Sequence, residues 1–202
     1  MDQNSLKIYT RSGDRGETSL YTGERLSKSD PLIEAIGTVD ECNSAIGMAL
    51  CFFTFDTPLN ETKEQLTTIQ HALFDLGAAL ATPRTRAAEK KLEATRFDEA
   101  GTHLLEKWID AMEGHLPKLK SFILPGGHPA GASLHLARSI CRRAERLVVP
   151  LNDLGDVSDA VMIYLNRLSD YLFVVSRFVN SHAKTPETSW EHYHRHPSSS
   201  ET

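Results

Sequence analysis

Apolar residues recur every three to four positions in five separate stretches of the chain, with polar residues between them. This spacing marks one face of an α-helix, because 3.6 residues make one turn. The chain has neither the alternating pattern of a half-buried strand nor an internal repeat. The pattern therefore predicts helices over residues 31–50, 61–81, 97–116, 130–149 and 157–182.

Prolines near the ends of these stretches support the assignment. Pro83 ends the second helix and Pro117 follows the third, because proline and the residue before it disfavour a continuing helix. Pro150 is expected to stop the fourth helix in the same way. Loops are expected at 55–60 and 83–91. Short connections between amphipathic helices indicate an all-α, up-and-down five-helix bundle.

The chain is expected to form one domain with two appendages. Residues 1–30 form an N-terminal arm, residues 31–183 form the bundle, and residues 184–202 form a tail without periodicity. Ser29 or Asp30 is the expected N-cap of the first helix, since both side chains can accept a hydrogen bond from its first turn.

The end of the tail is rich in histidine, at residues 192–196. We expect this run to be a mobile terminus. Weak metal binding by its imidazoles is the alternative.

The fourth helix has one strongly basic face. At about 100° per residue, Arg138, Arg142 and Glu145 fall within roughly 60° of one another, and His135 and Arg146 flank them. The opposite side is apolar and is expected to pack in the core: Leu136, Ala137, Ile140, Cys141, Ala144 and Leu147.

Two interpretations of this face remain open. It could be a solvated surface with ion pairs one turn apart. The use of arginine throughout favours a polyanion site instead, because the planar guanidinium binds phosphate or carboxylate through two hydrogen bonds. Pro125, Gly126 and Gly127 break the chain just before this helix, so free N–H groups at its start add a second kind of anion site.

The N-terminal arm between residues 6 and 30 is the only long non-helical part with a distinctive composition. Gly13, Gly16 and Gly23 permit close backbone approach, and the sequence is no Walker A loop. The arm is either a phosphate cradle or an ordinary surface loop. Its hydroxyl and basic groups come from Thr10, Ser12, Thr18, Ser19, Arg11, Arg15, Arg25 and Lys28.

The first and last helices also carry polar faces. The first is dense in acids, among them Asp40 and Glu41, and either faces solvent or pairs with the arginine helix within or between subunits. In the last, Asn166 and Asp170 lie one turn apart beside an apolar seam. Such residues form caps or a buried polar network, or they contact a ligand.

Composition limits the functions that fit. The chain has 202 residues, 40% of them apolar, which suffices for one core. A net charge of −5 and a pI near 6 argue against a nucleic-acid-binding protein. Three cysteines without C-x-x-C spacing suit a reducing compartment. With no long apolar run and no signal or transit pattern at the start, a cytoplasmic protein is expected.

Four motifs, in this order, resemble those of the PduO-type ATP:corrinoid adenosyltransferases. They are YTRSGDRGETS at 9–19, followed by GER at 23–25 and SKSD at 27–30; GTVDECN at 37–43; FILPGG at 122–127 leading to ARSICRRAER at 137–146; and YLNRLSDYLF at 164–173. The resemblance extends from about residue 7 to 190. It implies a ferritin-like five-helix bundle that forms a homotrimer, with ATP and corrinoid bound at subunit interfaces.

The resemblance also implies roles for individual residues. Asp40 and Arg138 resemble an intersubunit ion pair, and Phe122 resembles the residue that closes the lower axial face of the corrin ring. With Arg142, these three residues are the ones expected to act in catalysis. No side chain is assigned to a metal, since Mg²⁺ is expected on the ATP phosphates. The positions that resemble ATP contacts are Thr10, Arg11, Ser12, Gly13, Thr18, Ser19, Lys28, Arg142, Arg143, Ala144, Glu145, Arg146 and Asn166.

The implied reaction is attack of Co(I) on the 5′ carbon of ATP, which gives adenosylcobalamin and triphosphate. The nucleophile then belongs to the corrinoid, and the protein positions reactants and stabilises charge. A corrinoid reductase and an adenosylcobalamin-dependent enzyme are the expected protein partners. The alternatives are a carrier that hands adenosylcobalamin to such an enzyme, and a helical nucleotide-binding regulator.

Overall fold

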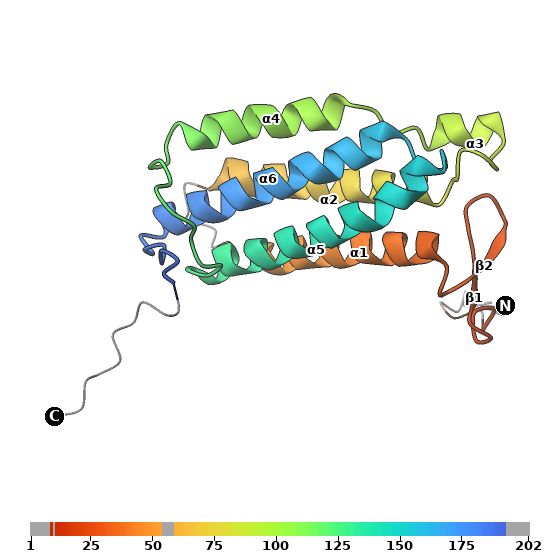
Figure 1. Cartoon of the computed structure of the whole chain (residues 1–202), viewed down its shortest axis with the longest axis horizontal. Coiled ribbons are helices and arrows are strands. Elements are labelled where there is room, and N and C mark those ends of the chain that lie inside the picture. Colours follow the sequence, from red (N-terminus) through yellow and green to blue (C-terminus); the bar gives the residue numbers. More distant parts are fainter. Residues whose placement is uncertain (1–8, 10, 54–58, 193–202) are drawn as a thin grey trace, which may run out of the picture.

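Five long helices lie side by side and form the body of the molecule (Figure 1). The computed structural model describes residues 9, 11–53 and 59–192. The expected all-α bundle is confirmed. The long helices are α1 (Pro31–Leu50), α2 (Asn60–Leu80), α4 (Ala100–Glu113), α5 (Pro129–Asp153) and α6 (Asp159–His182).

Helix α5 lies at the centre of the contacts, packing against α1 on one side and α6 on the other. Helix α1 also packs on α2, and α6 on α4. The apolar seams that the sequence predicted meet here, and each fully buried Leu or Ile contributes about 1.5–3 kcal/mol. Core residues with no more than 1% exposure include Ile46, Leu73, Leu134, Leu165 and Leu172.

Asp30 is the N-cap of α1, which decides between the two predicted caps. Its side chain accepts a hydrogen bond from Leu32 N at 2.9 Å, and Pro31 occupies the first turn. Proline costs nothing there because the first-turn N–H groups have no helical acceptor.

The prediction that Pro150 stops the fourth helix is wrong, because α5 continues to Asp153. A proline in the last turn removes only one N–H, and packing of the 6%-exposed Leu151 holds this turn on the bundle. The helix ends where Leu154 N donates to Pro150 O at 3.2 Å and Gly155 adopts a φ of +79°. Glycine is favoured at such an end because it has no Cβ.

The connection between α2 and α4 differs from the prediction in two ways. A short helix, α3 (Glu89–Ala94), overlaps the loop expected at 83–91, and α4 begins three residues later than expected. No residue of α3 is buried, so the sequence shows no apolar stripe for it. Phe97 lies before α4 and packs edge-on against Tyr164, with ring centroids 5.2 Å apart.

The arm contains two strands that the sequence did not predict, β1 (Glu17–Ser19) and β2 (Arg25–Ser27). They pair antiparallel with Thr18 opposite Leu26. Three residues are too few for alternation to be recognised. Leu20, just past β1, is buried, so the hairpin is anchored to the bundle.

The hairpin and the α4–α5 connection lie at opposite ends of the bundle (Figure 1). Beside the α4–α5 connection, the chain after α6 runs next to residues 122–124. Leu124 N donates to Thr188 O at 2.8 Å and Trp190 N donates to Phe122 O at 2.7 Å. The first part of the predicted tail is therefore paired.

Three predictions fall wholly or mostly outside the described residues. These are the loop at 55–60 except for its last two residues, the histidine run beyond His192, and the placement of Thr10. Among the helices that the structure does describe, none has the length and apolarity needed to cross a membrane.

Candidate functional site: a basic helix face, a glycine turn and an exposed phenylalanine

The arginine face of α5 contacts α6 through Asn166. Asn166 Nδ2 donates to Glu145 Oε1 at 2.8 Å, and Arg146 Nη1 donates to Arg142 O at 3.0 Å. Arg142, Arg146 and Asn166 are exposed, and Glu145 is half-buried. Asn166 is therefore neither a cap nor part of a buried network. The structure brings these four predicted residues together on one surface.

Two further predicted residues on this helix have structural contacts. Arg143 forms an ion pair with Glu41 of α1, so the expected pairing of the acidic and arginine helices occurs within one chain. Ala144 is fully buried in the core, so its side chain does not face the arginine surface.

Arg138 is half-buried and has no carboxylate partner among the described residues. Its Nε atom is buried without a hydrogen bond, and its guanidinium carbon lies 6.0 Å from the centre of the Phe173 ring. Burial lowers the pKa of Arg138, and the nearby charge of Arg142 lowers it further. Asp40 is exposed on α1 and makes no ion pair with Arg138 within the described chain.

His135 was placed beside the basic face by the sequence, but its side chain is only 3% exposed. Its Nε2 lies 3.1 Å from Ser176 Oγ, and its ring contacts Phe173. Burial, followed by the charge of Arg138, lowers the pKa of His135 to about 4. Leu136 was expected in the core but is 50% exposed, because the side of α5 that faces both α1 and α6 is centred on Ala137.

The glycine turn of the arm holds a lysine close to the backbone. A Cβ at Gly13 would lie 3.2 Å from Lys28 Nζ, and Lys28 N donates to Gly16 O at 2.8 Å. Arg25 braces this turn by donating to Ser12 O at 3.0 Å and to Glu17. Arg25 is thus already paired within the arm. The composition of the arm alone did not reveal this pairing.

The other predicted arm residues lie along the same segment. Arg11 has a φ of +59°, a strained value for a residue with a side chain, and its guanidinium carbon lies 5.6 Å from the centre of the Tyr9 ring. Thr18 and Ser19 lie in β1 opposite Leu26 and Arg25.

Phe122 is 81% exposed, although it is a large apolar side chain. Its ring meets the edge of Trp190, with centroids 6.4 Å apart. An exposed aromatic ring on a backbone held by hydrogen bonds is a candidate ligand contact. The sequence did not predict the role of Trp190, which only the pairing of distant segments reveals.

The sequence predicted no role for Arg177 of α6. It is only 5% exposed, and it donates to Pro117 O at 2.9 Å and to Glu187 Oε1 at 3.0 Å. It therefore ties the α4–α5 connection and the segment after α6 to the end of the bundle.

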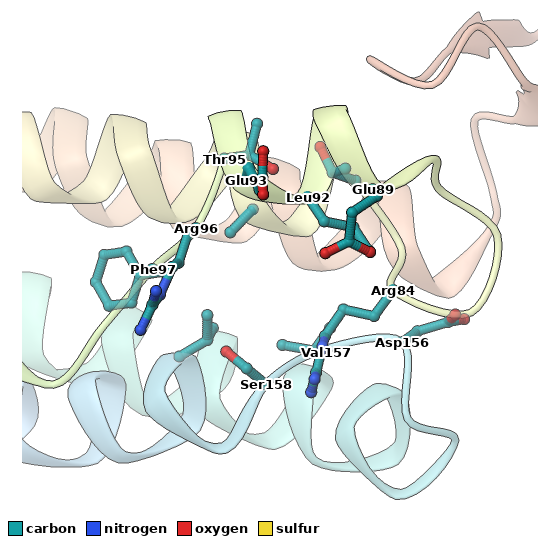
Figure 2. Close-up of a pocket in the computed structure, with 13 residues that line it drawn as sticks. Arg84, Glu89, Leu92, Glu93, Thr95, Arg96, Phe97, Asp156, Val157 and Ser158 are labelled. Atoms are coloured by element: carbon teal, nitrogen blue, oxygen red, sulfur yellow. The ribbon is translucent and has the colours of Figure 1, made fainter.

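A pocket of about 470 Å³ opens near the hairpin end of the bundle, and no predicted site residue lines it (Figure 2). Glu89 and Glu93 lie on α3, and Arg84 and Arg96 lie on the chain before and after this helix. Side chains of both charges line this pocket.

The described residues contain no group of three or more His, Cys, Asp or Glu side chains that could hold a metal ion. The arginine face of α5 and the glycine turn carry cationic and hydrogen-bonding groups. Such groups suit a ligand with several negative charges.

A helical bundle with guanidinium groups on one face and a lysine over a glycine turn is an arrangement suited to binding a polyanion. The chain belongs to the cobalamin adenosyltransferase family, whose model matches residues 8–179. The corrinoid adenosyltransferase MMAB of Mus musculus is 49% identical over 172 residues, covering 85% of this chain and 72% of the mouse protein. The corrinoid adenosyltransferase of Bacillus subtilis is 41% identical over 186 residues, covering 92% and 93%.

Solved structures agree with the family assignment. A phenylalanine-to-alanine variant of the PduO-type ATP:corrinoid adenosyltransferase from Lactobacillus reuteri, complexed with cobalamin and ATP, superposes with a TM-score of 0.83. It is 37% identical and covers 92% of this chain and 100% of that chain. An arginine-to-lysine variant of the same enzyme, complexed with ATP, has a TM-score of 0.81 at 37% identity, covering 91% and 100%.

Proposed function

We propose that this protein transfers the 5′-deoxyadenosyl group of ATP to the cobalt of a reduced corrinoid, forming adenosylcobalamin and releasing triphosphate. The observation that carries the proposal is the 81%-exposed Phe122, in a chain whose relatives are corrinoid adenosyltransferases. An apolar ring held at the surface by backbone pairing suits a flat, largely apolar face such as that of a corrin.

One bond forms and one bond breaks in this reaction. The electron pair of Co(I) forms the cobalt–carbon bond to C5′, and the C5′–O bond breaks with its electrons going to triphosphate. The protein therefore needs no nucleophile of its own. Its task is to align C5′ with cobalt and to stabilise the departing negative charge.

The arginine face is the proposed site for the triphosphate part of ATP. Arg142 and Arg146 supply guanidinium groups, and Asn166 holds Glu145 at their side. We propose that the glycine turn, with Lys28 over Gly13, wraps the nucleotide as the arm of the site. Arg11, Ser12, Thr18, Ser19 and the neighbouring Thr10 belong to the same proposed arm.

Mg²⁺ is proposed to enter with ATP. It commonly keeps several waters and binds through substrate phosphates with one or two carboxylates, so it needs no all-protein cage. Glu145 is the carboxylate on the proposed phosphate face.

Phe122 is proposed to exclude the lower axial ligand of the corrin. An apolar ring beneath the cobalt removes electron donation from that side, so Co(II) becomes easier to reduce to Co(I). The reductant would come from a corrinoid reductase, and the product would pass to an adenosylcobalamin-dependent enzyme. Free thiols at Cys42, Cys51 and Cys141 support a reducing compartment such as the cytoplasm.

A homotrimer with composite sites is proposed on two observations. Arg138 carries a buried Nε without a partner and Asp40 is an exposed carboxylate, so a second copy can supply the missing acceptor. The hairpin and the Phe122 connection lie at opposite ends of one bundle (Figure 1), and α5 alone spans about 37 Å at 1.5 Å per residue. If both serve one site, they come from different copies.

The direct experiment mixes purified protein with ATP, Mg²⁺ and chemically reduced cobalamin under anaerobic conditions. Loss of the Co(I) absorbance band, together with equal amounts of adenosylcobalamin and triphosphate, is expected. Binding of ATP without formation of a cobalt–carbon bond would instead favour the regulator. Transfer of adenosylcobalamin to a dependent enzyme without release of free product would add a carrier role.

A further inference from the structure

One side chain of α6 fixes the backbone that leads to the arginine helix. Asn180, which is 2% exposed, accepts a hydrogen bond from His128 N through Oδ1 at 2.9 Å. Its Nδ2 donates to Gly126 O at 3.0 Å. The two bonds lie on either side of Gly127, so a single amide holds the backbone in both directions. A buried amide with both groups bonded is costly to disturb.

Two glycines make room for this amide. A Cβ at Gly127 would lie 2.4 Å from Asn180 Oδ1, and a Cβ at Gly131 would lie 2.3 Å from the same atom. Gly127 also has a φ of +103°, which residues with side chains rarely adopt. Gly131 lies inside α5, where alanine is ordinarily favoured over glycine, so its close approach to Asn180 explains the glycine.

The same residue holds the segment that pairs with Phe122. The backbone oxygen of Asn180 accepts a hydrogen bond from Thr185 N at 2.9 Å. A few residues later, Trp190 N donates to Phe122 O at 2.7 Å, and the Trp190 ring meets the edge of the Phe122 ring. Asn180 thus anchors both stretches of chain that converge on Phe122.

We propose that Asn180 is a positioning residue that sets the orientation of Phe122 toward the corrinoid. Gly127 and Gly131 serve as the cradle for its amide. The role in catalysis depends on the proposed transferase function, whereas the control of Phe122 and Trp190 by Asn180 is a property of the chain itself. In this proposal Asn180 acts on Phe122 through the backbone of residues 122–128 and not through contact with either reactant.

The first test replaces Asn180 by alanine and reads the loop and the reaction separately. In a Trp108→Phe background, the fluorescence of Trp190 should shift and become easier to quench. With Co(II) cobalamin and ATP bound, the electron paramagnetic resonance signal should show more nitrogen ligation on the lower face. The adenosylation rate should fall about 10- to 100-fold, since misplacement by about 1 Å can cost that much, with ATP affinity within twofold.

A second test uses Gly131→Ala, whose new methyl group would collide with Asn180. Alone it should slow adenosylation about tenfold, but in the Asn180→Ala background it should have little further effect, because the collision is gone. Such non-additivity identifies the shared contact. Gly77→Ala is the matched control, since a Cβ on this helical glycine meets no atom within 4 Å.

If Asn180→Ala folds poorly, a second substitution at the same position can be measured instead. Asn180→Asp keeps the acceptor for His128 N but places a carboxyl oxygen against Gly126 O in place of the donor, so this variant should also lose adenosylation rate. Independent, multiplicative effects of the Asn180 and Gly131 substitutions would overturn the inference, as would an equal loss of ATP affinity. If the wild-type protein transfers no adenosyl group, the proposed function fails. An unchanged Trp190 spectrum in Asn180→Ala would separately overturn control of the loop by Asn180.

Discussion

The side-chain amide of Asn166 on α6 donates to Glu145 Oε1 on α5 at 2.8 Å, across the interface between these helices. This bond fixes the Glu145 carboxylate at the α5–α6 interface. If the arginine face binds phosphates, a Glu145 side chain released from this bond would compete with them for the guanidinium groups.

Asn166→Ala is therefore expected to weaken ATP binding about tenfold, in the range for a hydrogen bond to a charged group. Isothermal titration calorimetry measures the ATP affinity of this variant and of the wild-type protein. Asp170→Ala is the matched control, because Asp170 lies on the same exposed side of α6 and its ion pair within the described residues is with Arg167. An equal effect of both substitutions would contradict the role given to Asn166.

Phe122→Ala is expected to slow adenosylation by at least about tenfold and to leave ATP affinity nearly unchanged, because the ring is assigned to the corrin and not to the nucleotide. Single-turnover rates with Co(I) cobalamin and calorimetry with ATP measure the two effects. Leu124→Ala removes a 47%-exposed apolar side chain from the same segment and serves as the control. A large loss of ATP affinity would remove Phe122 from its proposed position.

Arg86 links the hairpin to the connection between α5 and α6. It donates to Glu24 Oε1 at 2.8 Å and to Asp156 Oδ2 at 3.3 Å. Arg86→Gln should raise the KM for ATP about threefold at low salt, because each exposed ion pair contributes at most about 1 kcal/mol and salt screens it. Arg84→Gln, on the same loop but outside these pairs, should have no such effect. Salt-independent losses would argue against anchoring by charge.

His135 is expected to make stability depend on pH. Its pKa is lowered to about 4 from an ordinary value of 6.5, so the unfolded chain binds the extra proton between these two values. Stability is then fully present above pH 6.5 and is lost as the pH falls toward 4. The free energy of unfolding should drop by about 2 kcal/mol between pH 7.5 and 5 from this group alone.

Urea unfolding at several pH values measures the effect, and His135→Gln should flatten the dependence within that window. The variant will still lose stability where carboxylates become protonated. Identical pH profiles for the two proteins would show that burial of His135 does not exclude its charged form.

The helices were predictable because a long buried stripe leaves a period in the sequence. Residues 31–50 match α1 to the residue, and α6 begins within two residues of the prediction. Pro150 misled because its effect depends on the packing of Leu151, which no local rule contains. The helix α3 and the two strands were missed because each is short and mostly exposed.

The candidate site divides along a similar line. Arg142, Glu145 and Arg146 were found because they share one helix face, and Asn166 because its motif resembles that of the family. The residues that hold the Phe122 loop could not be found in this way. Arg177 and Asn180 act on backbone atoms more than 50 positions away, and hydrophobic periodicity contains no information on such contacts.

Mixed oligomers test whether sites are shared. Lys28→Ala chains lack an arm contact and Phe122→Ala chains lack the corrin contact, so each homo-oligomer should be slow. If arm and Phe122 come from different copies, co-expressed chains should form intact sites, roughly a quarter of the total for random mixing. Isolation of mixed oligomers with two affinity tags and rate measurements decide the matter. No recovery of activity would mean that each chain serves its own site.

Placement of the hairpin and the Phe122 connection at opposite ends of the bundle has a consequence for inheritance (Figure 1). In an assembly of shared sites, each chain lends its hairpin to one site and its phenylalanine to another. One chain damaged at both ends would then silence two sites. In a cell with two alleles, activity would fall faster than the fraction of defective chains, so such a variant would act dominantly.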